Sequence, residues 1–271
     1  LPAVSFSLVF AVLRLPYFAI AGSVTLGAYS GYWVNTILGI PFIYAIPVDF
    51  VISGLTGVLV FRLFIYPARS AGALTLAILS VAIAFLMENV ARAMFGNAMR
   101  SFDLPLERDI ILGFAMISPL SLRVIGVSVI VVILLHLFLH RTQTGCAIRA
   151  TADNRDLASS KGINVSMITT TVIFIATGLA GIAGMMIGAE AALDPGLGFR
   201  SILSVFAATV VGGLGSIPGA IVGAIVIGLA EETSQFVLPA TYKGAIGFVA
   251  IMICLTYRPR GIFGTAIRKD A

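Results

Sequence analysis

The sequence predicts an all-α fold, a polytopic bundle of about eight or nine transmembrane helices. Hydrophobic residues make up 59% of the 271 residues, charged residues make up 11%, and the mean hydropathy is +1.07. A soluble domain has about 25% charged residues, so this chain has too few to cover a surface exposed to water. The apolar residues also form continuous runs of roughly the 20 residues that one helical crossing needs, without the period-two alternation of a transmembrane barrel.

The predicted crossings follow these runs in order. The full-length runs are residues 19–38, 42–61, 74–93, 120–139, 168–189, 220–237 and 243–257. Two shorter runs, 4–13 and 202–214, are candidates for full or half crossings. Because residue 1 is Leu1 and the run 4–13 is too short to cross alone, we expect the true N-terminus to lie upstream, with a cleaved signal sequence as the alternative.

Lysine and arginine residues are concentrated at three places, and these set the predicted orientation. They are Arg62 with Arg69, residues 141–161, and the C-terminal group of Arg258, Arg260, Arg268 and Lys269. Cytoplasmic flanks of membrane proteins carry an excess of these residues, so all three places, including the C-terminus, are predicted to be cytoplasmic. The loop 96–119 is then external, and its charges nearly cancel: Arg100, Arg108, Asp103, Glu107 and Asp109. The net charge of +5 belongs to the flanks and requires no nucleic-acid partner.

We expect one transmembrane domain over residues 1–271 and no second soluble domain, so energy supply and ligand capture must come from other polypeptides. Two cysteines, Cys146 and Cys254, predict no disulfide framework. His136 and His140 share a helix face, but no carboxylate or cysteine ligand is near them in the sequence, so no metal site is predicted. No Ser/His/Asp set is present, and an intramembrane enzyme therefore has only these two histidines in its favour.

Charges within the predicted crossings are costly and point to function or to helix packing. Glu88 and Arg92 are four residues apart on one helix face, with Asn89 beside them. They are either a buried pair that locks neighbouring helices or part of a permeation path. The remaining acids are expected to be solvated at the membrane interface: Glu190, Asp194, Glu231 and Glu232. Asp49, near Pro47, is placed either at the interface or one turn inside it.

Glycines in the second half of the chain recur at helical spacing. Gly184 and Gly188 share one run, and Gly215, Gly219 and Gly223 open another, which predicts close packing of helices within one subunit. The stretch 212–220 (GGLGSIPGA) is not a nucleotide loop, because no lysine follows and a proline stands where a dinucleotide fingerprint needs glycine. It is interpreted as a break between a short helix and the next crossing, with three candidate path residues: Gly213, Gly215 and Pro218.

The polar segment, residues 141–161, is the part of the chain best suited to water. Residues 145–162 predict one short amphipathic helix with a small apolar face of Ala150, Leu157 and Ala158. Its polar face is formed by Asp153, Asn154, Arg155 and Asp156. Gly162 is expected to end the helix at its C′ position. Such ordering favours a helix that docks on a soluble partner over a bare solvated loop.

Residues 147–165 resemble the cytoplasmic coupling loop of membrane subunits of bacterial ABC importers, and in particular of the branched-chain amino acid permease family. That family's pattern is R-A-x-x-x-[DN]-x-x-x-A-x-x-x-G-I, and it is matched by Arg149, Ala150, Asn154, Ala158, Gly162 and Ile163. Further stretches that resemble the family are 26–29 (LGAY), 66–69 (YPAR), 178–184 (GLAGIAG), 211–220 (VGGLGSIPGA) and 257–264 (YRPRGIFG). The resemblance therefore covers essentially the whole chain.

The resemblance implies a multi-pass permease subunit of an ATP-driven importer in the bacterial inner membrane. Its implied partners are two cytoplasmic ATP-binding subunits, a second and related permease subunit, and an extracytoplasmic solute-binding protein. ATP would be used by those partners, and no cofactor is expected in this chain. The coupling loop would cover residues 141–165, with its contacts made by Arg149, Ala150, Asp153, Asn154, Leu157, Ala158, Gly162 and Ile163.

One element departs from the family and bears on the substrate. The family often has Asn-Phe-Ala-His-Gly-Glu before the LGAY element, whereas this chain has YFAIAG at 17–22 and lacks the polar His and Glu. Branched-chain or related amino acids are the expected substrates, with urea or short amides as the alternative. The rival from another class is an ion-coupled secondary transporter that uses Glu88 with Arg92, or Glu190; broken, glycine-rich helices favour it. The lack of a clear inverted repeat and the polar segment count against it.

Overall fold

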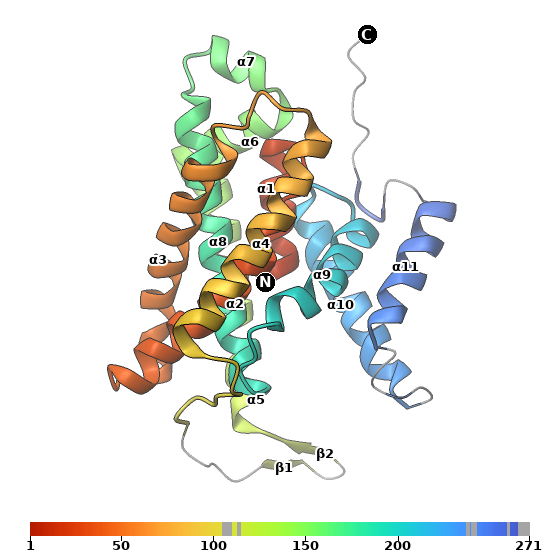
Figure 1. Ribbon diagram of the computed structural model, residues 1–271. Helices are drawn as coiled ribbons and strands as arrows, with labels where there is room; N and C mark the ends of the chain where they lie inside the picture. Colours follow the sequence, from red (N-terminus) through yellow and green to blue (C-terminus); the bar gives the residue numbers. More distant parts are fainter. Residues whose placement is uncertain (105–109, 113–114, 237–238, 240–242, 259–260, 265–271) are drawn as a thin grey trace.

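The computed structural model describes residues 1–104, 110–112, 115–236, 239, 243–258 and 261–264, and helices dominate these residues (Figure 1). The helices are α1 (Pro2–Leu13), α2 (Ala19–Tyr32), α3 (Phe42–Val60), α4 (Ala73–Phe95), α5 (Pro119–Arg141), α6 (Gln143–Asp153), α7 (Arg155–Ser160), α8 (Val165–Glu190), α9 (Leu197–Gly212), α10 (Ile217–Ser234) and α11 (Lys243–Tyr257). Two π-helical turns, η1 (Trp33–Ile37) and η2 (Phe61–Ile65), continue α2 and α3.

The all-α prediction has one small exception. Strands β1 (Ile110–Leu112) and β2 (Ala115–Ile117) form an antiparallel hairpin in which Ile110 pairs with Ile117. The hairpin lies in the predicted external loop 96–119. Glu107, Arg108 and Asp109, whose charges entered the prediction for that loop, lie outside the described residues, as do Arg260, Arg268 and Lys269.

Among the described residues, five helices are long and apolar enough to cross a membrane: Phe42–Ile65, Ala73–Phe95, Pro119–Arg141, Val165–Glu190 and Ile217–Ser234. Each overlaps a predicted crossing. The count of eight or nine is not confirmed, because Pro2–Leu13, Leu197–Gly212 and Lys243–Tyr257 are shorter apolar helices. The run 19–38 is a helix of 14 residues followed by a π turn, and its glycine, serine and tyrosine residues make it less apolar than the others.

The centre of the bundle is α8, which packs against α1, α2 and α3 and is largely buried. Glycines allow these backbones to meet. A Cβ atom on Gly27 would lie 2.1 Å from the Cα of Gly181, and one on Gly184 would lie 1.9 Å from the carbonyl oxygen of Val24. Small residues bring helices together in this way where lipid removes the hydrophobic drive for association. The prediction of close packing within one subunit is confirmed for Gly184.

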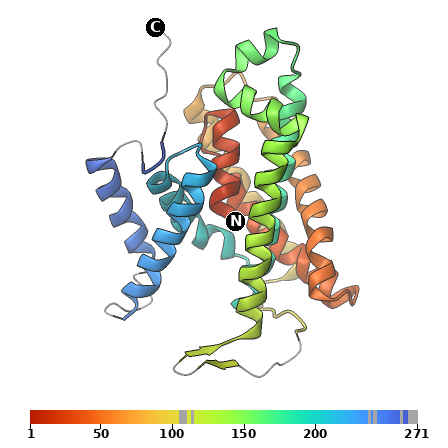
Figure 2. The same cartoon turned by 180° about the vertical axis from the view of Figure 1, so that it is seen from behind.

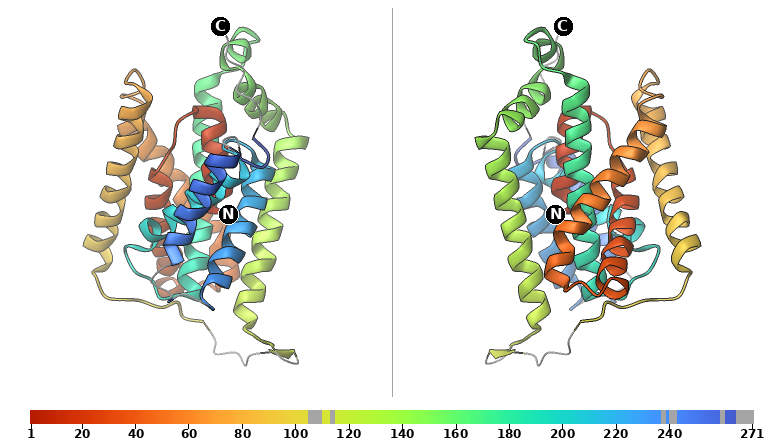
Figure 3. Two further views of the ribbon diagram at one scale, coloured as in Figure 1. Left: turned by 90° about the vertical axis from the view of Figure 1, so that its right-hand side faces the viewer. Right: turned by 90° about the vertical axis from the view of Figure 1, so that its left-hand side faces the viewer.

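A second group of helices is formed by α9, α10 and α11, which pack on one another beside the α8-centred group (Figure 3). A Cβ atom on Gly223 of α10 would lie 2.0 Å from the carbonyl oxygen of Ala208 on α9. Helix α9 begins inside the bundle, because its Gly198 contacts the backbone of Ala21 in α2 and donates its N–H to Thr25 Oγ1 at 3.1 Å. Helix α9 has 16 residues and comes directly before α10, so the prediction of a short helix before the next crossing is confirmed.

The two ends of the bundle differ in charge. Figures 1 and 2 show α6 and α7 at one end, together with the end of α3 and the start of α4, whereas the β1–β2 hairpin lies at the opposite end. The first end carries the basic residues of the polar segment and those near the end of α3, Arg62 and Arg69. Grouping of these positive charges at one end is what the predicted orientation requires.

Candidate functional site

The polar segment folds into two helices, α6 and α7, and the prediction of one continuous helix is wrong. The break is at Asn154, whose backbone is extended (φ −149°, ψ 109°). Its side-chain Oδ1 accepts a hydrogen bond from the Leu157 N–H at 2.9 Å and so caps α7. Asparagine favours such a capping position over the interior of a helix, because its side chain competes for backbone hydrogen bonds.

Helix α6 is fixed to the membrane helices on several sides. Ile148 and Thr151 are both 2% exposed and form its buried face, whereas Ala150, which the sequence placed on the apolar face, is only half-buried. A Cβ atom on Gly145 would lie 2.4 Å from the carbonyl oxygen of Phe138, so α5 and α6 meet at a tight corner. The Arg14 guanidinium at the end of α1 donates to the carbonyl oxygen of Ala152.

Helix α7 projects beyond the membrane helices (Figure 3) and presents most of its side chains to solvent. Ala158 is buried, but Leu157 is 57% exposed, so the predicted apolar face is divided between inside and outside. The remaining exposed contact candidates in this region are Arg149, Asp153, Asn154 and Gly162, and Ile163 is half-buried. Gly162 has φ +85°, and the Ile163 N–H donates to the Ala158 carbonyl at 3.1 Å, which confirms the predicted glycine at C′.

Glu88 and Arg92 form an ion pair between Glu88 Oε1 and Arg92 Nη2 at 2.5 Å. Glu88 is 7% exposed, and the Arg92 side chain is 43% exposed. Both residues are on α4, so the ion pair itself joins no second helix. Asn89 is exposed on another side of α4, and its Nδ2 donates to the Phe85 carbonyl at 2.8 Å. The structure therefore does not bring Asn89 into one cluster with Glu88 and Arg92.

The Glu88–Arg92 pair lies beside the start of α9, where the sequence expected only solvated acids. A Cβ atom on Gly196 would lie 3.8 Å from both Glu88 Oε1 and Asp194 Oδ1. Asp194 Oδ1 accepts from the Gly196 N–H at 3.0 Å, and Asp194 pairs with Arg200. Two carboxylates and two guanidinium groups are thus gathered at this helix start. The four residues are Glu88, Arg92, Asp194 and Arg200.

The glycine–proline break lies at the other end of α9, about 24 Å away by the 1.5 Å rise of a 16-residue helix. Gly213 and Gly215 have φ values of +109° and +83°, which favour glycine. Pro218 is at the start of α10, and Ser216 caps that helix by accepting from the Gly219 N–H at 3.2 Å. The C-terminal segment covers this turn through hydrogen bonds of Ile262 N–H to Val211 O and Phe263 N–H to Gly212 O, at 2.8 and 2.9 Å. Gly213, Gly215 and Pro218 are therefore in a tight covered turn and are not brought together with Glu88.

Asp49, which the sequence placed either at the membrane interface or one turn inside it, is a buried acid. It is 0% exposed between α2, α3 and α8. Its Oδ1 accepts hydrogen bonds from the hydroxyls of Ser30 and, at 3.3 Å, Ser53, whereas its Oδ2 has no partner among the described residues. These three helices contain no Lys, Arg or His. The i,i+4 spacing of Asp49 and Ser53 within an apolar run was the available signal.

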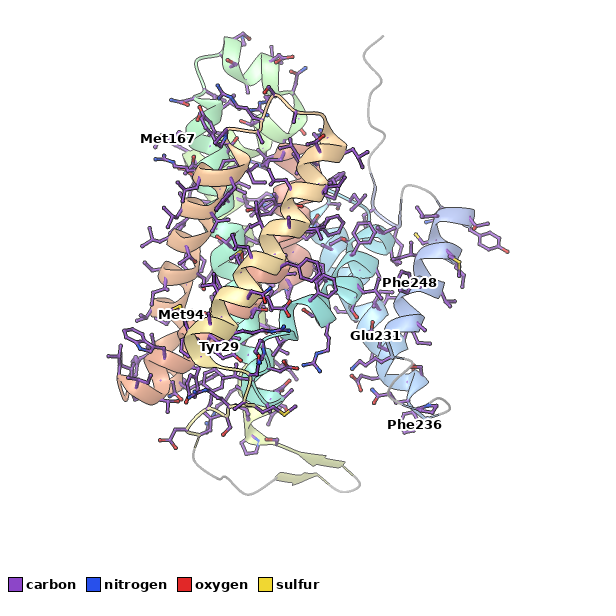
Figure 4. All side chains as sticks on the ribbon, viewed as in Figure 1. Tyr29, Met94, Met167, Glu231, Phe236 and Phe248 are labelled. Carbon is purple, nitrogen blue, oxygen red and sulfur yellow. The ribbon has the colours of Figure 1, made fainter. Side chains whose placement is uncertain are left out.

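Glu231 is a second buried acid, so the prediction that it is solvated is wrong. It lies on α10 (Figure 4) and is 5% exposed, and its Oε1 accepts from Ser204 Oγ of α9 at 2.5 Å. Its neighbour Glu232 is exposed and pairs with Lys243, and Glu190 is exposed at the end of α8. A one-residue difference on α10 thus separates a packed acid from a solvated one, because neighbouring positions face different sides of a helix.

The two histidines stack on each other with ring centroids 4.1 Å apart, and His140 Nδ1 lies 3.0 Å from the carbonyl oxygen of His136. Within the described part of the chain, no group of three or more His, Cys, Asp or Glu side chains could hold a metal ion.

Comparison with known proteins adds the family. Residues 1–255 match the family described as branched-chain amino acid transport system / permease component. The chain is 26% identical to the high-affinity branched-chain amino acid transport system permease protein BraD of Pseudomonas aeruginosa, over 97% of this chain and 90% of that protein. It is 28% identical to the probable branched-chain amino acid transport permease protein LivH of Methanocaldococcus jannaschii, over 98% of this chain and 89% of that protein.

A third relative, the permease protein LivH of Escherichia coli K12, is 33% identical over 51% of this chain and 45% of its own length. No solved structure matches. The family match covers nearly all of the described helices, which include five that can cross a membrane. The chain is a multi-pass membrane protein that belongs to the family of permease components of branched-chain amino acid transport systems.

Proposed function

We propose that this chain is the membrane-spanning subunit of an ATP-driven importer of branched-chain or related amino acids. The observation that carries the proposal is α7, a projecting helix at the basic end of the bundle with an exposed leucine and the family's loop pattern. Apolar side chains exposed on a short polar helix favour docking in a groove of a soluble partner. That partner would be a pair of cytoplasmic ATP-binding subunits, so ATP is used outside this chain and no cofactor is needed within it.

The attachment of α6 supports transmission of a movement from α7 to the bundle. Arg14 ties α6 to the end of α1, and the corner at Gly145 joins it to α5. A displacement of α7 by an ATP-binding subunit would therefore move several crossing helices together and shift the bundle between two states. Each state would be open to one side of the membrane.

The rest of the assembly follows from the orientation. With the basic end in the cytoplasm of a bacterial cell, the C-terminus is cytoplasmic and the inner membrane holds the bundle. The opposite end, with the β1–β2 hairpin, would receive the amino acid from an extracytoplasmic solute-binding protein. A second and related permease subunit would complete the pathway.

Leu157→Glu tests the docking role. We expect ATP-dependent leucine uptake by the reconstituted transporter to fall at least about tenfold, because a charge would replace the exposed apolar contact, equivalent to about 1.4 kcal/mol of coupling or more. Leu214→Glu is the matched control, since Leu214 is 38% exposed outside the polar segment. Wild-type uptake and wild-type co-purification of the ATP-binding subunit by Leu157→Glu would contradict the proposal.

A second candidate function is ion-coupled secondary transport, favoured by Asp49. An intramembrane acid without a basic partner is a default candidate for a coupling site. The test is leucine uptake into vesicles that contain this chain but no ATP and no ATP-binding subunit. Uptake that persists there and is abolished by Asp49→Asn would support this candidate, whereas strict dependence on ATP would exclude it. Urea and short amides, tested as substrates of the same preparation, address the remaining alternative.

A further inference from the structure

We propose that a cavity between α2, α4 and α9, together with Glu88 and Arg92, is the site where the permease holds one zwitterionic α-amino acid with an aliphatic side chain. This inference rests on the proposed function and adds the site that would recognise the substrate. Its two parts are an apolar cavity for the side chain and a charged pair for the amino and carboxylate groups.

The cavity has a volume of about 210 Å³ and is lined by apolar side chains from the three regions: Phe18, Ala21, Val81, Ala84, Phe199 and Ile202. A leucine side chain has four carbon-sized groups, so at about 30 Å³ each, the volume share of one water molecule, it would need roughly 120 Å³. The cavity therefore accommodates a branched aliphatic side chain. Its lining offers no hydrogen-bonding side chain for a polar substrate group.

The charged pair lies at one end of this cavity. On α4, Glu88 follows Ala84 by four residues and so stands on the same helix face, one turn further along. On α9, Phe199 lines the cavity and Gly196 precedes it by three residues; a Cβ atom on Gly196 would lie 3.8 Å from Glu88 Oε1. Two helices thus independently place the Glu88 carboxylate next to the cavity.

The pair complements the two charges of an amino acid. Glu88 is an acceptor for an ammonium group, and its ion pair with Arg92 uses one of its two carboxylate oxygens, Oε1. Arg92 is one turn further toward the hairpin end, and its half-exposed guanidinium can bind a carboxylate with two parallel hydrogen bonds. An amino acid placed with its side chain in the cavity would therefore add two opposite charges to a pair that is already balanced.

The position fits import. Glu88 and Arg92 are in the last third of α4, nearer the β1–β2 hairpin than the polar segment. A substrate released at that end would reach Arg92 first, since its side chain is the more exposed of the two. The ion pair itself lies within α4 and joins no second helix.

The first test fills the cavity with Ala84→Leu. In proteoliposomes that contain the complete transporter, we expect the ratio of leucine uptake to glycine uptake to fall at least about fivefold, since the added side chain would occupy the space for the substrate's own. Ala82→Leu is the matched control, because Ala82 is exposed on the same helix. An unchanged leucine-to-glycine ratio in Ala84→Leu would overturn the site.

The second test removes the negative charge of Glu88, which would bind the ammonium group of the substrate. In Glu88→Gln we expect KM for leucine to rise about tenfold, while 4-methylpentanoate, which lacks the ammonium group, becomes a relatively better competitor. If the ion pair were only structural, Glu88→Gln would lower total activity without changing the ratio of the inhibition constants of leucine and 4-methylpentanoate. Glu232→Gln, an exposed acid on α10, is the control and should leave that ratio as in the wild type. An unchanged ratio in Glu88→Gln would overturn the site.

Failure of this site and failure of the proposed function have different signatures. If the wild-type transporter takes up no aliphatic amino acid at all, the proposed function is wrong. If it takes up leucine in an ATP-dependent manner but Ala84→Leu and Glu88→Gln leave its selectivity unchanged, only the cavity and the pair are excluded.

Discussion

Asp49 and Glu88 both place a carboxylate inside the helical bundle, but their surroundings come from different sources. The shell around Asp49 is contributed by Ser30 of α2, Ser53 of α3 and the backbone at Gly181 of α8, so three helices meet at one acid. Glu88 has its ion-pair partner on its own helix, and that partner is half-exposed. Burial between helices makes the first acid part of the packing, whereas the second has a half-exposed partner, as the proposed substrate site requires. Exposure of the partner, more than depth in the membrane, separates the two.

The largest expected effect comes from breaking the packing around Asp49. Gly27→Leu would force a side chain into the backbone of Gly181, where even a Cβ atom would lie 2.1 Å from Cα. We expect a loss of at least about 3 kcal/mol in unfolding free energy, enough to remove folded protein from the membrane fraction. Gly126→Leu is the control, because a Cβ atom on Gly126 meets nothing within 4 Å. Equal amounts of the two variants in the membrane would show that the α2–α8 contact is looser than described.

Removing the Asp49 carboxylate should have the next largest effect. Asp49→Ala leaves the Ser30 and Ser53 hydroxyls without their shared acceptor and opens a small void, so we expect a loss of about 2–3 kcal/mol. Asp49→Asn keeps an acceptor oxygen and should cost about 1 kcal/mol or less. Thermal unfolding of the purified protein in nanodiscs measures both. An Asn loss as large as the Ala loss would mean that the charge, and not the hydrogen bonds, matters at this position.

At Glu88 we expect the opposite pattern, a small effect on stability and a large effect on transport. Because its partner is on the same helix and half-exposed, Glu88→Gln should change the unfolding free energy by no more than about 1 kcal/mol, although it should impair uptake strongly. Stability is read from the same nanodisc melts and function from leucine uptake. A loss of stability as large as that of Asp49→Ala would place Glu88 with the packing acids.

The smallest effect is expected at the exposed pair between Glu232 and Lys243, whose side chains are 65% and 41% exposed. Exposed ion pairs contribute about 0–1 kcal/mol, and Lys243→Gln should cost at most about 0.5 kcal/mol. Adding salt should shrink even this difference between wild type and variant, since screening acts on exposed charges. A loss of 2 kcal/mol or more, on the order of a buried pair, would show that this end of α10 and α11 is covered in the membrane.

The crossings of 23 residues or more, and the short helix before the break, were predictable because apolar runs directly report helices in lipid. Helix α2 was harder, since its glycines, serines and tyrosines pack against other helices and not against lipid, and hydropathy does not distinguish the two. The break at Asn154 could have been predicted from the capping preference of asparagine. The β1–β2 hairpin could not, because its residues carry no turn signal stronger than one glycine, Gly113.

For the candidate sites, the sequence identified the Glu88–Arg92 pair from its spacing alone. It could not reveal that Asp194 and Arg200 lie near that pair, because about a hundred residues or more separate them from it in the sequence. Nor could it distinguish Glu231 from Glu232, since only the direction that each side chain takes from α10 decides which is buried. Spacing predicts contacts within a helix, and contacts between distant helices require the fold.

The position of α4 has a mechanical consequence. Among the described elements it packs mainly along α2, with a small contact at the connecting turn η2 and a ring contact between Phe85 and Phe199 of α9, and much of its other flank is exposed. A helix that packs against its neighbour along one line can move easily in only one way, by rotation about that line. Every other displacement breaks packing. Such a rotation would change the distance between α4 and α9 while the glycine contacts of α2 with α8 stay intact. The bundle is therefore stiff at its centre and compliant along the wall that α4 forms.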